Sequence, residues 1–328
     1  MDPEAAFSDN NLAETVAERR RSQSFSDDYS VQRTNDDATQ CKISAIQLHY
    51  WEDPFIRTFT SGMEANSRKD PEIHIGYWAR VAAIYRSVLE FLDKNNGDCQ
   101  IVSLGSGFDT LFWRLKNEKH TFLKLVDVDF SSVTARKIRH IRKPGSELMQ
   151  FFSQAPNEQQ HCDLHCGDYH LTGADIRQWD ELKAKLDATG LDYNKPTFFL
   201  AECVLVYMSA DKSSELLKKI AETFSRATFL NYEQFRTSDQ FGKIMEKNLE
   251  KRGLQLPGLS AADSAESQKA RFLEAGWKTA EVKDMNEVYA GLPEAERKRI
   301  EAIERLDEME LLHQLLEHYC IAYATSSH

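Results

Sequence analysis

Long apolar runs are missing from this chain of 328 residues, and cysteine is scarce. No run approaches the roughly 20 apolar residues needed to cross a bilayer, and the N-terminus has no apolar segment typical of a signal peptide. The six cysteines are scattered along the chain rather than spaced as a disulfide framework. We therefore expect reduced thiols, no membrane partner, and a location in the cytoplasm, with the nucleus as a further compartment.

Positive charge is also in short supply. Lys and Arg number 41 against 52 for Asp and Glu, which gives a formal net charge of -11 at pH 7. Partners rich in phosphate bind basic surfaces, so this balance argues against nucleic acid as a partner. The apolar fraction of 41% is that of an ordinary globular protein, and the chain is long enough for a substantial core. We expect a monomer.

The N-terminal segment differs in composition from the rest. Residues 1–38 are polar and charged with few large apolar side chains, which predicts a disordered tail. Residues 39–328 are interpreted as a single domain with an N-terminal helical cap and substrate-binding insertions. Apolar residues recur at helical spacing near 41–50 and 75–94 and predict the helices of that cap.

Compact apolar runs then alternate with helical patterns. Strands are expected within 99–104, 121–130, 169–176, 195–208 and 227–235, and a closing strand within 317–326. Helices are expected after the glycines through Leu115, over 131–143, 179–188 and 211–223, and near 293–312, with a helix, turn and strand over 267–285. Strands that alternate with helices predict an α/β fold, with a Rossmann-like parallel sheet covered by helices on both faces.

A glycine turn follows the first expected strand, in "IVSLGSGFDTLFWRLK". Gly105 and Gly107 allow a ligand to approach the backbone closely because no Cβ is in the way. A dinucleotide fingerprint requires a third glycine three residues later, where this chain has Thr110, and no Gly-Lys-Ser/Thr sequence of a P-loop follows. The turn is compatible with several nucleoside ligands.

Two aspartates end the second expected strand. Asp127 and Asp129 lie 20 and 22 residues after Gly107, and a carboxylate at that place accepts hydrogen bonds from the hydroxyls of a ribose. S-adenosylmethionine has a ribose and a sulfonium cation but no pyrophosphate, so it does not need the third glycine. The combination favours this methyl donor over NAD; the alternative is a pair of aspartates that end a strand in solvent.

Two further acids follow later strands. Asp175, with Ile176 beside it, follows the third strand and is placed to meet an adenine amino group while Ile176 packs on the ring. Glu202 ends the fourth strand within an apolar run, and a carboxylate buried there needs a cationic or polar partner. That partner is either a core arginine or a cation of the donor.

These segments resemble a known family. "GYWAR", "LGSGFDTLFWRL", "DVDF", "GADIR", "AECVLVYM", "NYEQ", "SQKARFLEAGW" and "LDEMELL" occur in this order, from about residue 39 to about residue 324. They resemble the leucine carboxyl methyltransferases of eukaryotes. The resemblance implies a class I S-adenosylmethionine-dependent methyltransferase. It also implies methyl esterification of the C-terminal leucine α-carboxylate of the protein phosphatase 2A catalytic subunit, a reaction that regulates assembly of the phosphatase holoenzyme.

The resemblance also implies roles for single residues. Lys42 and Arg80 match basic residues at the carboxylate end of the donor and in the active site, and Tyr207 lies where it lines the methyl-transfer pocket. The remaining cofactor-binding positions that match are Gly105, Gly107, Asp127, Asp129, Asp175, Ile176 and Glu202. Since an α-carboxylate with a pKa of roughly 3.5 is ionised at neutral pH, no histidine has to act as a base. Arg80 is the candidate to hold that carboxylate, or the carboxylate of the donor.

Other interpretations stay open. His161, Cys162, His165, Cys166 and His170 are spaced as zinc ligands could be, but no second ligand pair follows, so we expect no metal. A related transferase acts on a modified guanosine of transfer RNA and carries a long C-terminal β-propeller; the end of this chain at His328 and its acidity argue against that activity. A non-catalytic module that binds S-adenosylmethionine is the third possibility.

Overall fold

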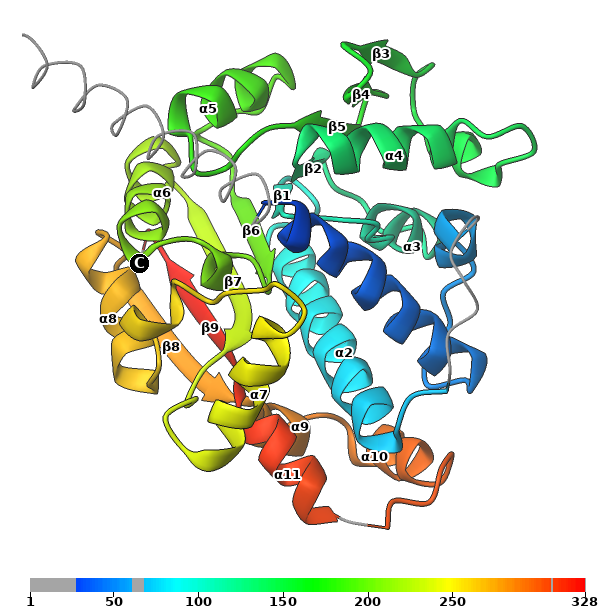
Figure 1. Cartoon of the computed structure of the whole chain (residues 1–328). Coiled ribbons are helices and arrows are strands. Elements are labelled where there is room, and N and C mark those ends of the chain that lie inside the picture. The colour runs from blue at the N-terminus through cyan, green and yellow to red at the C-terminus, as the bar shows by residue number, and fades with distance from the viewer. Residues whose placement is uncertain (1–27, 61–67, 308, 328) are drawn as a thin grey trace, which may run out of the picture.

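A single mixed sheet forms the centre of the protein. The computed structural model describes residues 28–60, 68–307 and 309–327, and within them nine strands lie in the order β3-β4-β5-β2-β1-β6-β7-β9-β8 (Figure 1). The strands β5, β2, β1, β6 and β7 are parallel to one another, and β9 is antiparallel to both of its neighbours. The strand bounds are β1 Gln100–Leu104, β2 Lys124–Asp129, β3 Asn157–Gln159, β4 Asp163–His165, β5 Tyr169–Gly173, β6 Thr197–Glu202, β7 Ala227–Gln234, β8 Thr279–Asp284 and β9 Tyr319–Thr325.

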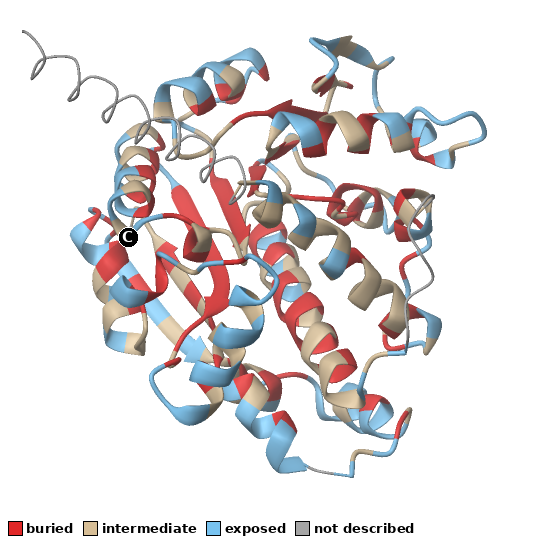
Figure 2. Cartoon of the chain, viewed as in Figure 1, coloured by how far each residue is buried: buried red, intermediate tan, exposed pale blue. Residues whose placement is uncertain are grey.

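Helices cover both faces of this sheet because the central strands are apolar on both sides. In β1 all five residues are buried, and Ile101 and Val102 belong to two different hydrophobic clusters, one on each face. One face carries α2 Pro71–Lys94, α3 Leu111–Asn117, α4 Ser131–Ile141, α9 Met285–Ala290 and α11 Met309–Glu317. The other carries α5 Trp179–Ala188, α6 Ala210–Thr223 and α8 Ala265–Glu274. In Figure 2 the sheet is buried between the helices, most of which turn exposed residues outward, whereas α2 is largely buried or half-buried.

The strand order creates a switch point. The chain runs from β1 to β2 and then to β5 on one side of β1, and it continues with β6 and β7 on the other side. Loops that leave the carboxyl ends of β1 and β6 therefore diverge, and ligands of doubly wound sheets bind at that crevice. The glycine turn after β1 lies there, as the sequence predicts.

The boundary expected for the N-terminal tail requires correction. Residues 28–47 form a helix (dark blue in Figure 1), so the segment 28–38 is ordered and not part of a disordered tail. This segment has few apolar side chains, and polar contacts to distant parts of the chain hold it in place instead. Residues 1–27 of the expected tail lie outside the described residues.

Three other details differ from the expectations. The helix expected near 293–312 is divided into α10 Glu294–Glu301 and α11, because Glu304 between them is buried against His74 and Tyr50. A short antiparallel hairpin, β3 and β4, precedes β5, and its strands are too brief to show a sequence pattern. Helix α7 Gln240–Glu250 also has no counterpart among the expected elements.

None of the helices in the described ranges is long and apolar enough to cross a membrane.

Candidate active site

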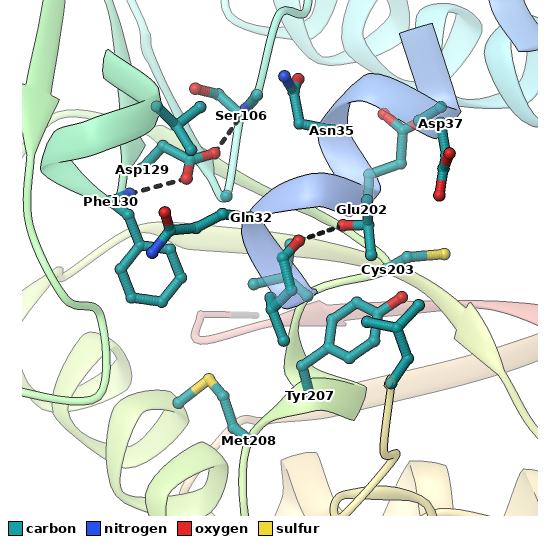
Figure 3. Close-up of a pocket in the computed structure, with 18 of the residues that line it drawn as sticks. Gln32, Asn35, Asp37, Ser106, Asp129, Phe130, Glu202, Cys203, Tyr207 and Met208 are labelled. Atoms are coloured by element: carbon teal, nitrogen blue, oxygen red, sulfur yellow. Dashed lines mark hydrogen bonds between the residues drawn. The ribbon is translucent and has the colours of Figure 1, made fainter. Parts of the chain in front are cut away.

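A cavity of about 670 Å³ opens at the carboxyl ends of the parallel strands. Its wall includes residues that follow β1, β2, β5, β6 and β7, and the helix 28–47 covers it. Figure 3 shows Gln32 and Asn35 of this helix in the same cavity as Ser106, Asp129 and Tyr207. Of the ten predicted site residues, all except Asp127 line this cavity.

The glycine turn has a shape that only glycine allows. Gly105 and Gly107 have φ values of +62° and +51°, in the left-handed region. A Cβ on Gly105 would lie 2.5 Å from Val204 Cγ2, and a Cβ on Gly107 would lie 2.5 Å from Asn35 Oδ1. Between them, the buried Ser106 hydroxyl has no hydrogen-bond partner among the described residues. The turn is therefore a narrow cradle with an unused polar group.

Asp129 faces this cradle from the end of β2. Its carboxylate accepts hydrogen bonds from the backbone N–H groups of Gly107 and Phe130, both at 2.7 Å. Burial raises the pKa of Asp129 to about 6, although these two N–H groups favour the ionised form. A carboxylate in this position can accept further hydrogen bonds from ligand hydroxyls in the cavity.

Asp127 does not line the cavity, in contrast to the other predicted site residues, and its carboxylate has partners in the core. Its carboxylate accepts hydrogen bonds from Lys137 Nζ at 2.7 Å and from the Tyr169 hydroxyl at 2.8 Å. Asp127 and Lys137 are both buried, Lys137 completely. The residue neutralises a core lysine of α4 and does not line the cavity.

Asp175 and Ile176 line the cavity beyond β5, as expected. The carboxylate of Asp175 is paired with Arg177, whose outer amino groups bond the carboxylate of Asp28 at 2.7 and 2.9 Å. Since Asp28 lies on the helix 28–47, Arg177 joins the covering helix to the β5 end of the site. Side-chain hydrogen bonds to Asp175 and Asp28 raise the pKa of Arg177, which stays charged.

Arg80, Glu202 and Lys42 form a buried ion cluster at the middle of the cavity. Arg80 Nε donates to the Glu202 carboxylate, and Lys42 Nζ lies 3.5 Å from the same carboxylate and 3.2 Å from Asp109. Burial alone would lower the pKa of Lys42, but Glu202 and Asp109 outweigh it and raise the pKa. The core arginine considered as a partner of Glu202 is therefore Arg80. The terminal amino groups of Arg80 carry its other N–H donors.

A group of tyrosines surrounds Arg80. Its guanidinium carbon lies 4.6 Å from the ring centre of Tyr232 and 5.4 Å from that of Tyr77, and the rings of Tyr232 and Tyr319 are stacked. Tyr207, on η3 Leu205–Tyr207, lines the same region. Burial raises the pKa of Tyr319 to about 12 and that of Tyr207 further, so both hydroxyls are neutral. Of these tyrosines, only Tyr207 is predicted from the sequence.

The other wall residues that sequence reasoning missed come from the covering helix and from strand ends, among them Gln32, Asn35, Phe130, Cys203, Val204, Met208 and Gln234. Cys203 has a φ of +57° directly after β6, and burial raises its pKa to about 11, which keeps the thiol protonated. The motif "NYEQ" could have pointed to Gln234. No comparable signal marks residues 28–40 of the covering helix.

The cluster of histidine and cysteine over 161–170 lies apart from the cavity. His165 and His170 are paired across β4 and β5, with their Nδ1 atoms 2.8 Å apart, and Cys166 is buried. Within the part of the chain that the structure describes, no three His, Cys, Asp or Glu side chains are arranged to hold a metal ion.

The fold and the sequence are similar to known proteins. A crystal structure of a protein assigned as a methyltransferase from Thermobifida fusca superimposes with a TM-score of 0.53 at 14% identity, covering 79% of this chain and 84% of the other. The model of the leucine carboxyl methyltransferase family matches residues 16–221. Leucine carboxyl methyltransferase 1 of Caenorhabditis elegans is 54% identical over 99% of both chains, and that of Rattus norvegicus is 42% identical over 91% of this chain and 90% of its own.

A second kind of relative is longer. The human tRNA wybutosine-synthesizing protein 4 is 36% identical over 90% of this chain, but the match covers only 44% of that protein.

The strand order, the glycine cradle and the acid at the end of β2 define a class I S-adenosylmethionine-dependent methyltransferase. The chain belongs to the leucine carboxyl methyltransferase family, and it catalyses S-adenosylmethionine-dependent carboxyl methylation.

The site fits this methyl donor. The cradle at Gly105 and Gly107 leaves no room for side chains. The Ser106 hydroxyl, which has no partner among the residues that the structure describes, and the Asp129 carboxylate line the cavity and can bond to the hydroxyl groups of a ligand. Asp175 and Ile176 are in place for an adenine, and the cluster of Arg80, Lys42 and Glu202 for a charged amino-acid end. When bound, S-adenosylmethionine supplies an electrophilic methyl group on a sulfonium.

Proposed function

We propose that this enzyme methylates the α-carboxylate of a C-terminal leucine, and that its acceptor is the catalytic subunit of protein phosphatase 2A. The observation that carries the proposal is the position of Arg80. Its guanidinium is buried, is held by Glu202 on one edge, and lies over the ring of Tyr232. A guanidinium fixed in this way presents its remaining N–H donors to a second carboxylate, which it binds with a geometry that lysine cannot reproduce.

The cavity wall near Arg80 supports a carboxylate acceptor, because Glu202 there is ion-paired with Arg80 and Lys42 and is not free to act as a base. Among the described residues no histidine lines the cavity, and the neutral Cys203 thiol and tyrosine hydroxyls titrate well above neutral pH. An acceptor carboxylate arrives ionised and needs no base: one of its oxygens bonds to the methyl carbon while the carbon–sulfur bond breaks, and no proton moves. The enzyme contributes alignment of the reacting atoms and exclusion of water.

The test is transfer of a labelled methyl group to the purified phosphatase catalytic subunit. The matched acceptor lacks only the terminal leucine, and a third reaction contains transfer RNA from cells deficient in the wybutosine pathway. We expect alkali-labile label on the complete subunit alone. Label on both protein acceptors, on neither, or on the RNA would contradict the proposal.

Arg80→Lys tests the role of the guanidinium. If Arg80 holds the acceptor carboxylate, the variant lowers turnover at least about tenfold, or about 1.4 kcal/mol of transition-state stabilisation, and leaves donor affinity unchanged in calorimetry. A parallel loss of donor affinity would assign Arg80 to the carboxylate of the donor instead.

A further inference from the structure

Gln234, the last residue of β7, holds an unused hydrogen-bond acceptor inside the cavity. Its side chain is 5% exposed and lines the cavity, and its amide oxygen Oε1 has no hydrogen-bond donor among the described residues. A buried amide oxygen without a donor is costly, so such atoms are rare in folded proteins. At a cavity wall, a ligand can provide the missing donor.

The position of Gln234 assigns it to the acceptor and not to the methyl donor. The residues that fit the ribose and the adenine of the donor follow β5, β2 and β1, whereas Gln234 ends β7, on the other side of β6. Gln234 is paired in register with Tyr319 of β9, so both side chains lie on one face of the sheet. The cavity therefore continues past Arg80 and Glu202 into a second half, walled by β7 and β9.

Arg80 and Gln234 both lie at the face of β7 that carries Tyr232. Tyr232 and Gln234 are two positions apart on β7, so their side chains project to the same face of the sheet, about 7 Å apart along the strand. The Arg80 guanidinium lies over Tyr232, 4.6 Å from its ring centre. In one amino-acid residue, the carboxyl carbon and the amide nitrogen are both bonded to the same Cα. With a hydrogen bond of about 2.9 Å at the carboxylate and another at the N–H group, the total length is similar to the separation of Tyr232 and Gln234 along the strand.

We infer that Gln234 Oε1 accepts the backbone N–H of the terminal residue of the acceptor, while Arg80 holds the carboxylate of that residue. This inference rests on the proposed function and makes Gln234 the residue that recognises a peptide chain end. A hydroxy acid or fatty acid has no N–H at this position and leaves the buried oxygen unpaired. A free amino acid brings a charged ammonium group, which has to lose its water shell in the cavity.

The experiment compares two folded acceptors that differ in one atom. The phosphatase catalytic subunit is made by ligation with a normal terminal leucine, or with the corresponding 2-hydroxy acid, so that an ester oxygen replaces the last amide N–H. We expect wild-type enzyme to methylate the ester acceptor with a kcat/KM at least about tenfold lower. This comparison uses the wild-type enzyme and does not depend on the folding of a variant.

Gln234→Met tests whether the lower kcat/KM on the ester acceptor is due to Gln234, because methionine has a similar length but no amide oxygen. The variant is expected to lose the same factor on the amide acceptor and to show no further loss on the ester acceptor, with unchanged donor affinity. Gln314→Met, at an exposed position of α11, is the matched control and keeps the full preference for the amide. Equal rates of wild-type enzyme on both acceptors would overturn the inference, as would an additive loss in Gln234→Met. A wild-type enzyme that labels neither acceptor would contradict the proposed function as well.

Discussion

Two aspartates of β2 have opposite roles although they are two positions apart. Both project to the same face of the sheet, so the alternation of the strand cannot tell them apart. Lys137 of α4, ten residues further along the chain, covers Asp127 and takes up its charge, whereas Asp129 lies at the end of the strand beside the glycine turn. The sequence therefore predicts an acid here, but only packing shows which one lines the cavity.

Asp127→Asn is expected to destabilise the fold and to spare donor binding. The substitution leaves the fully buried Lys137 without a carboxylate, a loss of about 3 kcal/mol or more in the free energy of unfolding. Denaturant titration measures this loss, and calorimetry with S-adenosylmethionine is expected to give the wild-type Kd once the protein is folded. A weakened Kd at wild-type stability would return Asp127 to the donor site.

The pKa of Asp129 predicts a pH dependence of donor affinity. Burial raises it to about 6 in the ligand-free enzyme, so the folded state binds this proton more tightly than the unfolded chain does. The stability contributed by this proton is present below about pH 4 and is lost as the pH rises through about 6. A donor that bonds to the ionised Asp129 carboxylate therefore binds more tightly as the pH rises through the same range. We expect the Kd to fall about tenfold between about pH 5 and about pH 7.

Asp129→Asn is the control for that pH dependence. Its affinity is expected to be lower and independent of pH over the same range, because the amide does not titrate. Calorimetric titrations at a series of pH values measure both proteins. A wild-type Kd that stays constant from about pH 5 to about pH 7 would contradict the assignment of Asp129.

At the level of helices and strands, the sequence predicts best those elements whose position is determined by a pattern of apolar residues. The central strands and the helices α2 and α4–α6 lie where the patterns indicate, because each buries an apolar face. The helix 28–47 was recognised only from residue 41 onward. Its first part is held by charged partners far away in sequence, such as Arg177 and Arg136. Ion pairs between distant residues leave no local pattern, so this part of the site could not be predicted.

The covering helix is expected to control the exchange of the donor. Asp28 is bound to Arg177 by two hydrogen bonds, and both side chains are about one quarter exposed. A pair of this exposure contributes about 0.2–1 kcal/mol, so Asp28→Asn is expected to speed donor release up to about fivefold. Stopped-flow displacement of a fluorescent donor analogue measures this rate.

The control for the covering helix is Asp187→Asn, which removes an exposed ion pair with Lys183 within α5, outside the cavity. Its release rate is expected to equal that of the wild type. If Asp28→Asn also releases the donor at the wild-type rate, the contact with Arg177 does not hold the helix closed over the ligand.

Across the whole molecule, the order of the strands divides one cavity between two ligands. The strands β5, β2 and β1 end at the half that fits the donor, and β6, β7 and β9 form the half beyond Arg80. Helix α7 and the following residues 251–257 lie at this second half, where Leu249 and Leu254 line the cavity. Ile244 of α7 is 55% exposed beside this region. An acceptor whose terminal residue enters the cavity therefore meets an apolar side chain outside it.

Ile244→Asp separates docking of a folded acceptor from recognition of its last residue. We expect the variant to lower kcat/KM for the folded phosphatase subunit about tenfold, since a charge replaces an apolar contact at the protein–protein interface. A peptide copying only the last residues of the subunit stays within the cavity and does not reach the exposed Ile244 side chain, so its lower rate is expected to stay unchanged. Leu273→Asp, which alters an exposed apolar residue of α8 that does not line the cavity, is the matched control and is expected to affect neither acceptor. An equal loss on protein and peptide would mean that Ile244 supports the cavity wall, and equal wild-type rates on both acceptors would mean that docking outside the cavity adds nothing to orientation.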